Sequence, residues 1–550
     1  MSNPTRHGGA VLADHLVTYG VRRVFSVPGE SFLAALDGLH DTGIDNIVCR
    51  QEGGAAMMAE AYGKLTGTPG VCFVTRGPGA TNASAGIHIA QQDSTPMVMF
   101  VGQIARDQTD REAFQEVDYT QMFGGLAKWT AQINQTERLG EYIARAFRVA
   151  MSGRPGPVVL ALPEDMLSAL VDHAPAAPIS PPIRPAPDGQ AILDLLADAE
   201  RPLIVAGGPL WSQTAADNLA MFAATQNIPM TTGFRRQDLA DNSHPCYAGD
   251  LNVAINPALA LRVRDADTIL LLGTRLGDIE TQGYTLLDPA GHGKTLIHVH
   301  ASDDELGRVY APTLAVHTTA PLMLEQLATA PRVTGDIDDW TASARADYDM
   351  WITPKETPGD VKMEQVIAHL NDVLPEDAIL TNGAGNYAGW LHRYYVWTKY
   401  STQLAPTSGS MGYGFPAAIS AALEHPDRPV ICLAGDGCFQ MTCNELSTAK
   451  QYGANLTVIV VNNGRYGTIR MHQEVNYPSR VSGTVLENPD FAALAKAYGG
   501  HGETVLDQSQ LEGALSRALA HNGPSVIELT VDPEALTTGR TLTQIREAAT

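Results

Sequence analysis

Short apolar runs alternate with amphipathic segments along most of the chain. In residues 1–170, apolar runs such as RVFSVPG, GVCFVT and PVVLALP alternate with stretches of helical periodicity such as EGGAAMMAEAYGKLTG. Apolar strands that alternate with helices are typical of βαβ units, so this pattern predicts a buried parallel sheet covered by helices. The same alternation of apolar runs with helical segments recurs in residues 191–330 and 361–550. The sequence therefore predicts three α/β domains, each a doubly wound parallel sheet.

Two segments without this alternation separate the predicted domains. Residues 171–190 read VDHAPAAPISPPIRPAPDGQ, and this proline-rich composition is typical of a linker. Residues 331–360 include VTGDIDDWT and TPKETPGD, which we interpret as a helix-poor connector. Several domains are also expected from the length of 550 residues, because one domain holds roughly 150 residues.

The amino-acid composition of the chain indicates which classes of partner and which cellular compartment to expect. The formal net charge of −23 repels phosphate backbones and anionic headgroups, which argues against nucleic acid or a membrane as partner and favours a small-molecule substrate. The first residues lack the apolar core of a signal peptide, so we expect a cytoplasmic protein. Six scattered cysteines form no CxxC pair, and we expect them to be buried and reduced: Cys49, Cys72, Cys246, Cys432, Cys438 and Cys443.

Polar side chains follow two apolar strands in the last third of the chain. Asp436 stands between two glycines directly after PVICLAG, and Asn462 and Asn463 follow LTVIVV. The 27 positions from Asp436 to Asn463 (463 − 436) leave room for one helical crossover between neighbouring parallel strands, whose carboxyl ends meet at one sheet edge. A carboxylate, an amide oxygen and a backbone carbonyl from the turn after Asn463 are hard ligands that suit Mg²⁺. Flanking glycines allow backbone N–H groups to approach a phosphate, so we predict a metal-bridged diphosphate site.

The stretch GDGCFQMTCNELSTAKQYGANLTVIVVNN resembles the thiamine diphosphate motif of the enzymes related to acetolactate synthase and pyruvate decarboxylase. The resemblance extends over the whole chain and implies a pyrimidine-binding domain, a central domain and a diphosphate-binding domain. It implies thiamine diphosphate and Mg²⁺ as cofactors, with Asp436, Asn463 and the carbonyl of Arg465 as metal ligands. It also places Gly437 and Cys438 beside the diphosphate, and it implies a homodimer or homotetramer with active sites between subunits.

Three further motifs match cofactor contacts of this family. Glu52, in CRQEGGAAMMAEAYG, follows an apolar strand, where the family places the glutamate that hydrogen-bonds the aminopyrimidine ring. A partly buried carboxylate suits this proton-sharing work at neutral pH. In TSGSMGYGFPAAI, the resemblance implies that the carbonyl of Gly409 accepts from the 4′-amino group and that Met411 is the apolar wedge between the two rings. Asn386, in TNGAGNYAG, is implied as a polar contact of the diphosphate.

The reaction type depends on residues around the substrate. The segments REAFQEVD and LAKWT most resemble acetolactate synthases, in which the residues matching Phe114, Gln115 and Lys128 border the substrate pocket. The His-His pair found in this region of pyruvate decarboxylases has no counterpart here. The resemblance therefore implies acetolactate synthase-like carboligation of 2-oxo acids through an enamine intermediate.

Three positions depart from the synthase pattern. Ile279 replaces the arginine that holds the carboxylate of the second keto acid, a charge-assisted pair worth roughly 2 kcal/mol. His472 stands in place of an apolar tryptophan, although it could equally be a surface histidine. Glu30 stands where related decarboxylases and lyases carry a group that faces the reactive carbon, so it is a candidate proton donor as well as an ordinary helix-start glutamate.

These departures leave alternatives open. One is a 2-oxo acid decarboxylase or a C–C lyase of 2-hydroxy ketones or acyl-CoA compounds, and another is a non-catalytic homologue that only binds the cofactor. In the central domain, His298 and His300 alternate on the strand TLIHVH, but without an evident third ligand we expect no metal there. The turn VAGGPLW lacks GxGxxG, so the central domain could hold a nucleotide such as FAD or nothing.

Overall fold

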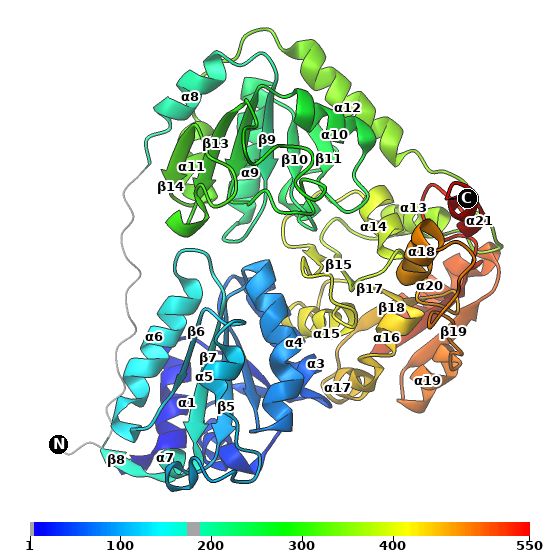
Figure 1. Cartoon of the computed structure of the whole chain (residues 1–550). Coiled ribbons are helices and arrows are strands. Elements are labelled where there is room, and N and C mark those ends of the chain that lie inside the picture. The colour runs from blue at the N-terminus through cyan, green and yellow to red at the C-terminus, as the bar shows by residue number, and fades with distance from the viewer. Residues whose placement is uncertain (1–4, 173–186, 550) are drawn as a thin grey trace.

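Three parallel sheets of six strands each form three lobes of the molecule (Figure 1). The computed structural model describes residues 5–172 and 187–549. All strand pairs within these three sheets are parallel, and alternate residues of several strands belong to different hydrophobic clusters. In strand β5 (Met97–Gln103), for example, Val98 and Phe100 pack on one face while Met99 and Val101 pack on the other. Helices cover both faces, which confirms the prediction of three doubly wound α/β domains.

The N-terminal lobe has the strand order β3-β2-β4-β5-β7-β6. Its other strands are β2 (Arg23–Ser26), β3 (Asp45–Val48), β4 (Gly70–Val74), β6 (Trp129–Gln132) and β7 (Pro157–Pro163). Its helices are α1 (Gly8–Thr18), α2 (Leu33–His40), α3 (Glu52–Thr66), α4 (Pro78–Asp93), α5 (Tyr119–Phe123), α6 (Leu139–Met151) and α7 (Glu164–Ser168). A separate antiparallel pair joins β1 (Thr5–His7) to β8 (Leu170–Asp172).

The central lobe has the strand order β11-β10-β9-β12-β13-β14. These strands are β9 (Pro202–Ala206), β10 (Met230–Thr232), β11 (Tyr247–Asp250), β12 (Thr268–Leu272), β13 (Thr295–His300) and β14 (Leu314–His317). Its helices are α8 (Gln190–Ala197), α9 (Gln213–Gln226), α10 (Pro257–Asp265) and α11 (Ala320–Leu327). The proposed linker, residues 171–190, lies largely outside the described residues, which omit 173–186.

The C-terminal lobe has the strand order β16-β15-β17-β18-β20-β19. These strands are β15 (Ile379–Asn382), β16 (Gln403–Leu404), β17 (Val430–Gly435), β18 (Leu456–Asn462), β19 (His501–Val505) and β20 (Pro524–Thr530). Its helices are α13 (Met363–Val373), α14 (Ala388–Tyr394), α15 (Gly414–Glu424), α16 (Asp436–Phe439), α17 (Leu446–Gln451), α18 (Gly467–Asn476), α19 (Phe491–Ala497), α20 (Leu511–Ala520) and α21 (Leu542–Glu547).

Two local predictions are wrong. The segment 331–360 is not helix-poor, because it contains the 15-residue helix α12 (Asp338–Ile352). Thr341, Ala344 and Tyr348 are buried at helical spacing, and Arg262 of α10 holds Asp347 at 2.8 Å, so α12 packs on the central lobe. The single helix expected after the GDG turn is instead broken into α16, a 3₁₀ turn at Cys443–Glu445 and α17.

The N-terminal and C-terminal lobes share one hydrophobic cluster. It joins helices α3 and α4 to α15 and to strands of both sheets. Glu60 of α3 is buried without exposed surface at this contact. Its carboxylate accepts hydrogen bonds from Thr95 Oγ1 and from Tyr413 Oη, each at 2.6 Å. Burial raises the pKa of Glu60 to about 7, although the nearby Lys64 opposes the shift.

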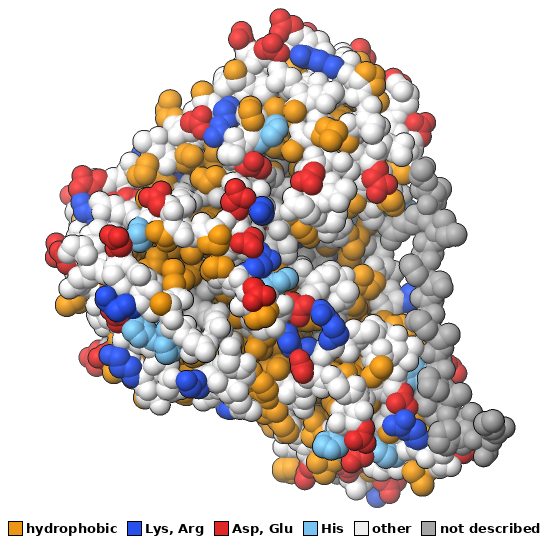
Figure 2. Space-filling model, turned by 180° about the vertical axis from the view of Figure 1, so that it is seen from behind, with side chains coloured by type: hydrophobic (Ala, Val, Ile, Leu, Met, Phe, Trp, Pro, Cys, Tyr) orange, Lys and Arg blue, Asp and Glu red, His pale blue; other side chains and the backbone are white. Residues whose placement is uncertain are grey.

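The face seen from behind is hollowed where the three lobes meet, and both basic and acidic side chains lie around this hollow (Figure 2). On this face the charged side chains are interspersed and do not gather by sign. Within residues 5–172 and 187–549, no helix is both long enough and apolar enough to span a membrane.

We predict that the charge of Glu60 makes stability depend on pH. The folded protein binds the Glu60 proton more tightly than an exposed glutamate does, so this stabilisation is complete below pH ~4 and is lost as the pH rises through about 7. Glu60→Gln should therefore melt at a higher temperature than the wild type at pH 8 and lose this advantage at pH 5. Calorimetric scans at both pH values test this, and an equal difference at both would contradict it.

Candidate active site

Asp436 and Asn463 line one cavity of about 230 Å³ at the carboxyl edge of the C-terminal sheet. Strands β17 and β18 are neighbours, with Gly435 paired to Val461, so the residues that follow them lie close together. Gly409, Met411, Gly437, Cys438 and Arg465 line the same cavity. Three of the segments that resemble cofactor motifs, around Met411, Asp436 and Asn463, therefore converge at one site although they are separate in the sequence.

Asp436 is almost completely buried and held by three donors. Its Oδ1 accepts from the N–H of Gly437 at 2.8 Å, and its Oδ2 accepts from the N–H of Gly464 at 2.9 Å and from Asn488 Nδ2 at 2.8 Å. Burial raises the pKa of Asp436, while these hydrogen bonds favour the charged form. Asn488 was not predicted from the sequence, and its surroundings, VLENPD, carry no signal for this role.

The two adjacent asparagines have different surroundings. Asn462 is directed away from the cavity, because its amide donates to Glu528 at 2.7 Å and its carbonyl oxygen accepts from Asn488 at 2.8 Å. Asn463 lines the cavity, and its Oδ1 accepts only a longer bond of 3.2 Å from the N–H of Arg465. This leaves Asn463 Oδ1 with a lone pair that a cation could use.

The donor set around Asn463 fits Mg²⁺. The backbone of Arg465 forms an antiparallel bridge with Val485 in which only the flanking residues exchange hydrogen bonds, so the Arg465 carbonyl points away from that partner. Together with the carboxylate of Asp436, this gives three hard oxygen donors of the kind that Mg²⁺ prefers. The glycine beside Asp436 is also required, because a Cβ on Gly437 would lie 2.5 Å from the ring of Tyr466.

The loop that carries Gly409 and Met411 is fastened to the GDG turn. Gly409 has φ +66°, a conformation that glycine adopts without strain, and Met411 is half-buried at the cavity wall. The N–H of Gly412 donates to Cys438 Sγ at 3.1 Å, and Tyr387 Oη donates to the same sulfur at 3.3 Å. The Cys438 side chain therefore ties three loops together.

Asn386 lines the cavity but its side chain already has partners. Its Oδ1 accepts from Thr468 Oγ1 at 2.9 Å, and its Nδ2 donates to the carbonyl of Leu536 at 3.1 Å. Its placement therefore fits an anchor between loops better than a free donor aimed at a diphosphate. His472 of α18 is exposed and is absent from the described cavity lining, where Ile469 of the same helix is found instead.

Glu52, Glu30 and Gln115 come together at the carboxyl edge of the N-terminal sheet. Glu52 begins α3 and accepts from Asn82 Nδ2 at 2.9 Å. Glu30 accepts a hydrogen bond from Arg76 Nη2 at 3.0 Å. The loop that carries Arg76 also contacts Gln115, since a Cβ added to Gly77 would lie 2.7 Å from the Cβ of Gln115. Among the described lining residues of the Asp436 cavity, none of these three is present. One chain therefore carries both halves of the expected site without joining them.

Models of known protein families match three parts of this chain. The chain matches family models described as the N-terminal binding domain, the central domain and the C-terminal binding domain of thiamine pyrophosphate enzymes, at residues 6–122, 190–327 and 383–529. Together these matches cover more than half of the 550 residues.

The chain belongs to the thiamine pyrophosphate enzyme family. It is 30% identical to the acetolactate synthase isozyme 2 large subunit of Escherichia coli over 96% of both chains. It is 32% identical to the acetolactate synthase large subunit of Parasynechococcus marenigrum, over 96% of this chain and 88% of that protein. The mitochondrial catalytic subunit of acetolactate synthase from Saccharomyces cerevisiae is 31% identical, over 96% of this chain and 80% of that protein. This member of the family is thus an acetolactate synthase-like, thiamine diphosphate-dependent enzyme.

Two further residues that the resemblance placed beside the substrate are absent from the described lining of the Asp436 cavity in this family member. Lys128 directly precedes β6, so it lies at the amino edge of the N-terminal sheet, opposite the edge that carries Glu52. Its Nζ donates to the carbonyls of Val149 and Ser152, and burial lowers its pKa to about 8. Phe114, next to Gln115 in the chain, is 74% exposed. Within one chain Lys128 therefore lies on the opposite side of the sheet from Glu52, and its place beside the substrate stays a prediction.

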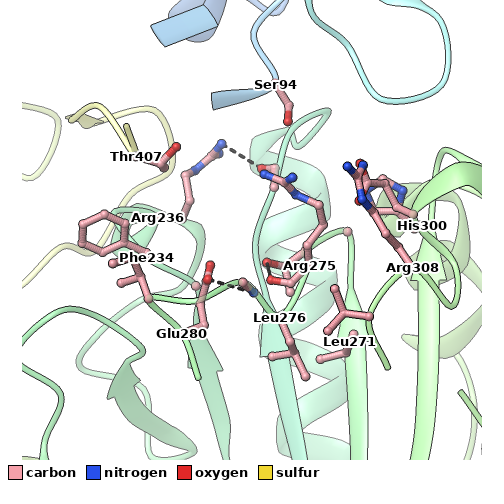
Figure 3. A pocket seen from close by; sticks show the side chains of 18 of the residues that line it. Ser94, Phe234, Arg236, Leu271, Arg275, Leu276, Glu280, His300, Arg308 and Thr407 are labelled. Carbon is pink, nitrogen blue, oxygen red and sulfur yellow. Dashed lines mark hydrogen bonds and ion pairs between the residues drawn. The ribbon is translucent and has the colours of Figure 1, made fainter. Parts of the chain in front are cut away.

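A larger cavity of about 330 Å³ lies between the central lobe and the other two (Figure 3). Four cationic and four acidic side chains line it: Lys64, Arg236, Arg275, Arg308, Asp93, Asp278, Glu280 and Glu305. The guanidinium groups of Arg236, Arg275 and Arg308 all point toward the side of Ser94 (Figure 3). Gly208 and Gly273 also line this cavity, and their φ angles of +72° and +76° let the two backbone segments approach each other closely.

Ile279 and the paired histidines also belong to this central cavity. His298 Nε2 pairs with the carbonyl of Thr274 at 3.0 Å and His300 Nδ1 with that of Ser302 at 3.2 Å. Burial lowers the pKa of His298 to about 4, so its ring stays neutral at pH 7. In the described part of the chain, no group of three or more His, Cys, Asp or Glu side chains has the arrangement to hold a metal ion.

We predict that Asp436→Ala weakens Mg²⁺-dependent binding of thiamine diphosphate by at least about 100-fold, because even indirect metal partners cost 10- to 100-fold when lost. Isothermal titration with and without Mg²⁺ measures the effect. Asp372→Ala, which removes an exposed aspartate of α13, is the matched control and should bind like the wild type. Tight, Mg²⁺-dependent binding by Asp436→Ala would refute the assignment of the metal site.

Proposed function

We propose that this chain is a thiamine diphosphate- and Mg²⁺-dependent enzyme that joins 2-oxo acids in an acetolactate synthase-like carboligation. The observation that carries this proposal is the convergence of Asp436, Asn463 and the Arg465 carbonyl on a cavity that Met411 also lines. When bound, thiamine diphosphate supplies a carbon that adds to the carbonyl of a 2-oxo acid and accepts the electron pair left by CO₂.

Different residues of the cavity have different proposed roles in holding the cofactor. The oxygens of Asp436, Asn463 and Arg465 hold Mg²⁺, which neutralises a diphosphate in a chain of net charge −23. Gly437, Cys438 and Asn386 contribute lining beside the diphosphate, and Gly409 and Met411 set the bend of the cofactor. The placement of these residues in one cavity and the family resemblance support these proposed roles.

Glu52 is the proposed activating acid, and it acts from a second copy of the chain. Within one chain Glu52 lies on the edge of the N-terminal sheet and is absent from the described lining of the Asp436 cavity. A homodimer, or a homotetramer built from such dimers, would let the N-terminal edge of one copy close the cavity of the other. The relatives named as large or catalytic subunits are consistent with an oligomeric assembly.

A second candidate function is a 2-oxo acid decarboxylase or C–C lyase, and the Glu30–Arg76 contact favours it. Arg76 is buried, and its guanidinium donates to Glu30 at 3.0 Å and to Glu164 at 2.9 Å. The Glu30 side chain is 70% exposed on the edge that would face the second copy. The Glu30 carboxylate, fixed at this edge, repels an anionic acceptor. Glu30 is therefore a candidate for contact with the substrate, together with Gln115 and the exposed His472. A non-catalytic homologue is disfavoured, because Glu52 and the metal donors are all present.

The central cavity is the proposed site of a nucleotide cofactor, with FAD as the first candidate. Arg236, Arg275 and Arg308 suit the phosphates of a nucleotide, and carboxylates such as Glu280 suit ribose hydroxyl groups. The side chains present therefore fit such a group by their chemistry.

We predict that the protein, loaded with Mg²⁺ and thiamine diphosphate, converts pyruvate to acetolactate. NMR of the products, with and without added acetaldehyde, tests this, and Asp436→Ala serves as the control that should form no product. Acetaldehyde or a mixed hydroxyketone as the main product would contradict carboligation of two keto acids and establish the second candidate. Unchanged pyruvate beside tightly bound cofactor would contradict both.

A further inference from the structure

The thiamine loop, residues 405–413, carries Gly409 and Met411 and is held at its first end by the N-terminal lobe of the same chain. Lys64 Nζ, on α3, donates to the carbonyl of Ala405 at 2.6 Å. Asp93 Oδ1, at the end of α4, accepts from the N–H of Thr407 at 2.7 Å and also from Thr407 Oγ1. Lys64 and Asp93 in turn form a buried ion pair at 2.7 Å. Three hydrogen bonds from two side chains thus fasten the loop at residues 405–407.

The second end of the thiamine loop is held by the same two helices. Tyr413 has no exposed surface, and its hydroxyl donates to Glu60 Oε2 at 2.6 Å. Thr95, just after α4, donates to the other oxygen of Glu60 at 2.6 Å. Because both ends are fixed by buried hydrogen bonds, the position of Met411 depends on contacts that lie outside the thiamine cavity.

The first of these attachment points is also a wall of the central cavity. Lys64, Asp93 and Thr407 all line that cavity, together with Arg236 and Arg275. Figure 3 shows Thr407 on the ribbon of the C-terminal lobe, facing the same space as Arg236 and Arg275. The contact between Asp93 and Thr407 therefore has the central cavity on one side and the thiamine loop on the other.

We propose that Asp93 is a positioning residue for the thiamine loop, and that its contact with Thr407 couples a nucleotide in the central cavity to thiamine diphosphate binding. The inference rests on the proposed function of both cavities. A nucleotide that fills the central cavity packs against the wall that Asp93 and Thr407 form and reduces the freedom of residues 405–407. The second ligand then meets a loop that is already ordered, so the two ligands bind with positive cooperativity. By thermodynamic linkage, each ligand increases the binding affinity of the other by the same factor.

Thr407→Val tests the coupling directly, because it removes one donor to Asp93 and keeps the shape of the side chain. Binding of thiamine diphosphate with Mg²⁺ is titrated at zero and at saturating FAD, and FAD binding is titrated with and without thiamine diphosphate. In the wild type we expect both factors to be equal and about fivefold or larger. In Thr407→Val we expect the factor to fall to within about twofold of one while the melting temperature of the ligand-free protein changes little.

Thr402→Val is the matched control, since Thr402 is buried in the same lobe and donates to the carbonyl of Lys399 without lining either cavity. It should keep the wild-type factor. A factor of one in the wild type, or the full factor in Thr407→Val, would overturn the proposal even though both ligands bind.

Hydrogen exchange of residues 405–413 in the ligand-free protein gives a second, independent readout. We expect faster exchange of this segment in Thr407→Val and in Asp93→Asn than in the wild type and in Thr402→Val, because a fastening contact is lost. Unchanged exchange would overturn the positioning role of Asp93. A wild-type protein that binds no thiamine diphosphate would instead refute the proposed function, and the exchange experiment would still decide the role of Asp93.

Discussion

The buried contact between Glu445 and the start of α3 within one chain fixes how the two halves of the candidate site lie relative to each other. Glu445, which follows the GDG turn by nine positions (445 − 436), is buried without exposed surface between the two lobes. Its carboxylate accepts from the N–H groups of Arg50 at 3.1 Å and Gln51 at 3.0 Å, directly before Glu52. Gly54 is required at this contact, because a Cβ there would lie 2.6 Å from the Glu445 carboxylate. A buried carboxylate whose oxygens accept backbone N–H groups is costly to disrupt, so this contact holds the two lobes rigidly.

This rigid contact separates the two halves of the site. It holds the turn of Glu52 against one end of the C-terminal lobe, while Asp436 and Asn463 open into a cavity whose described lining contains no residue of the N-terminal lobe. Under the proposed function, the groups of this cavity hold the diphosphate and the cation, and the activating acid comes from another chain. Oligomerisation is thus a condition of the proposed activity and not only a means of adding stability.

Sequence predicts best what depends on neighbours along the chain. The apolar strands, the sheet edge that collects Asp436 and Asn463, and the helix start at Glu52 all follow from local patterns, and the structure has them as expected. Local pattern alone does not distinguish Asn462 from Asn463, a choice that came from the family resemblance, because Glu528 and Asn488, which turn Asn462 away, come from distant segments. The same limit applies to α12, whose apolar stripe is short, and to the central cavity, whose lining comes from all three lobes.

Mixing two inactive variants tests the central claim that each site is built from two chains. Glu52→Gln should bind the cofactor and Asp436→Ala should not, and neither should turn over substrate alone. Coexpressed, they form mixed dimers in which one of the two sites combines an intact Glu52 with an intact Asp436. Random pairing then predicts recovery of about a quarter of wild-type turnover. Recovery of this size would support the account, whereas no recovery in verified mixed dimers would show that each chain builds its site alone.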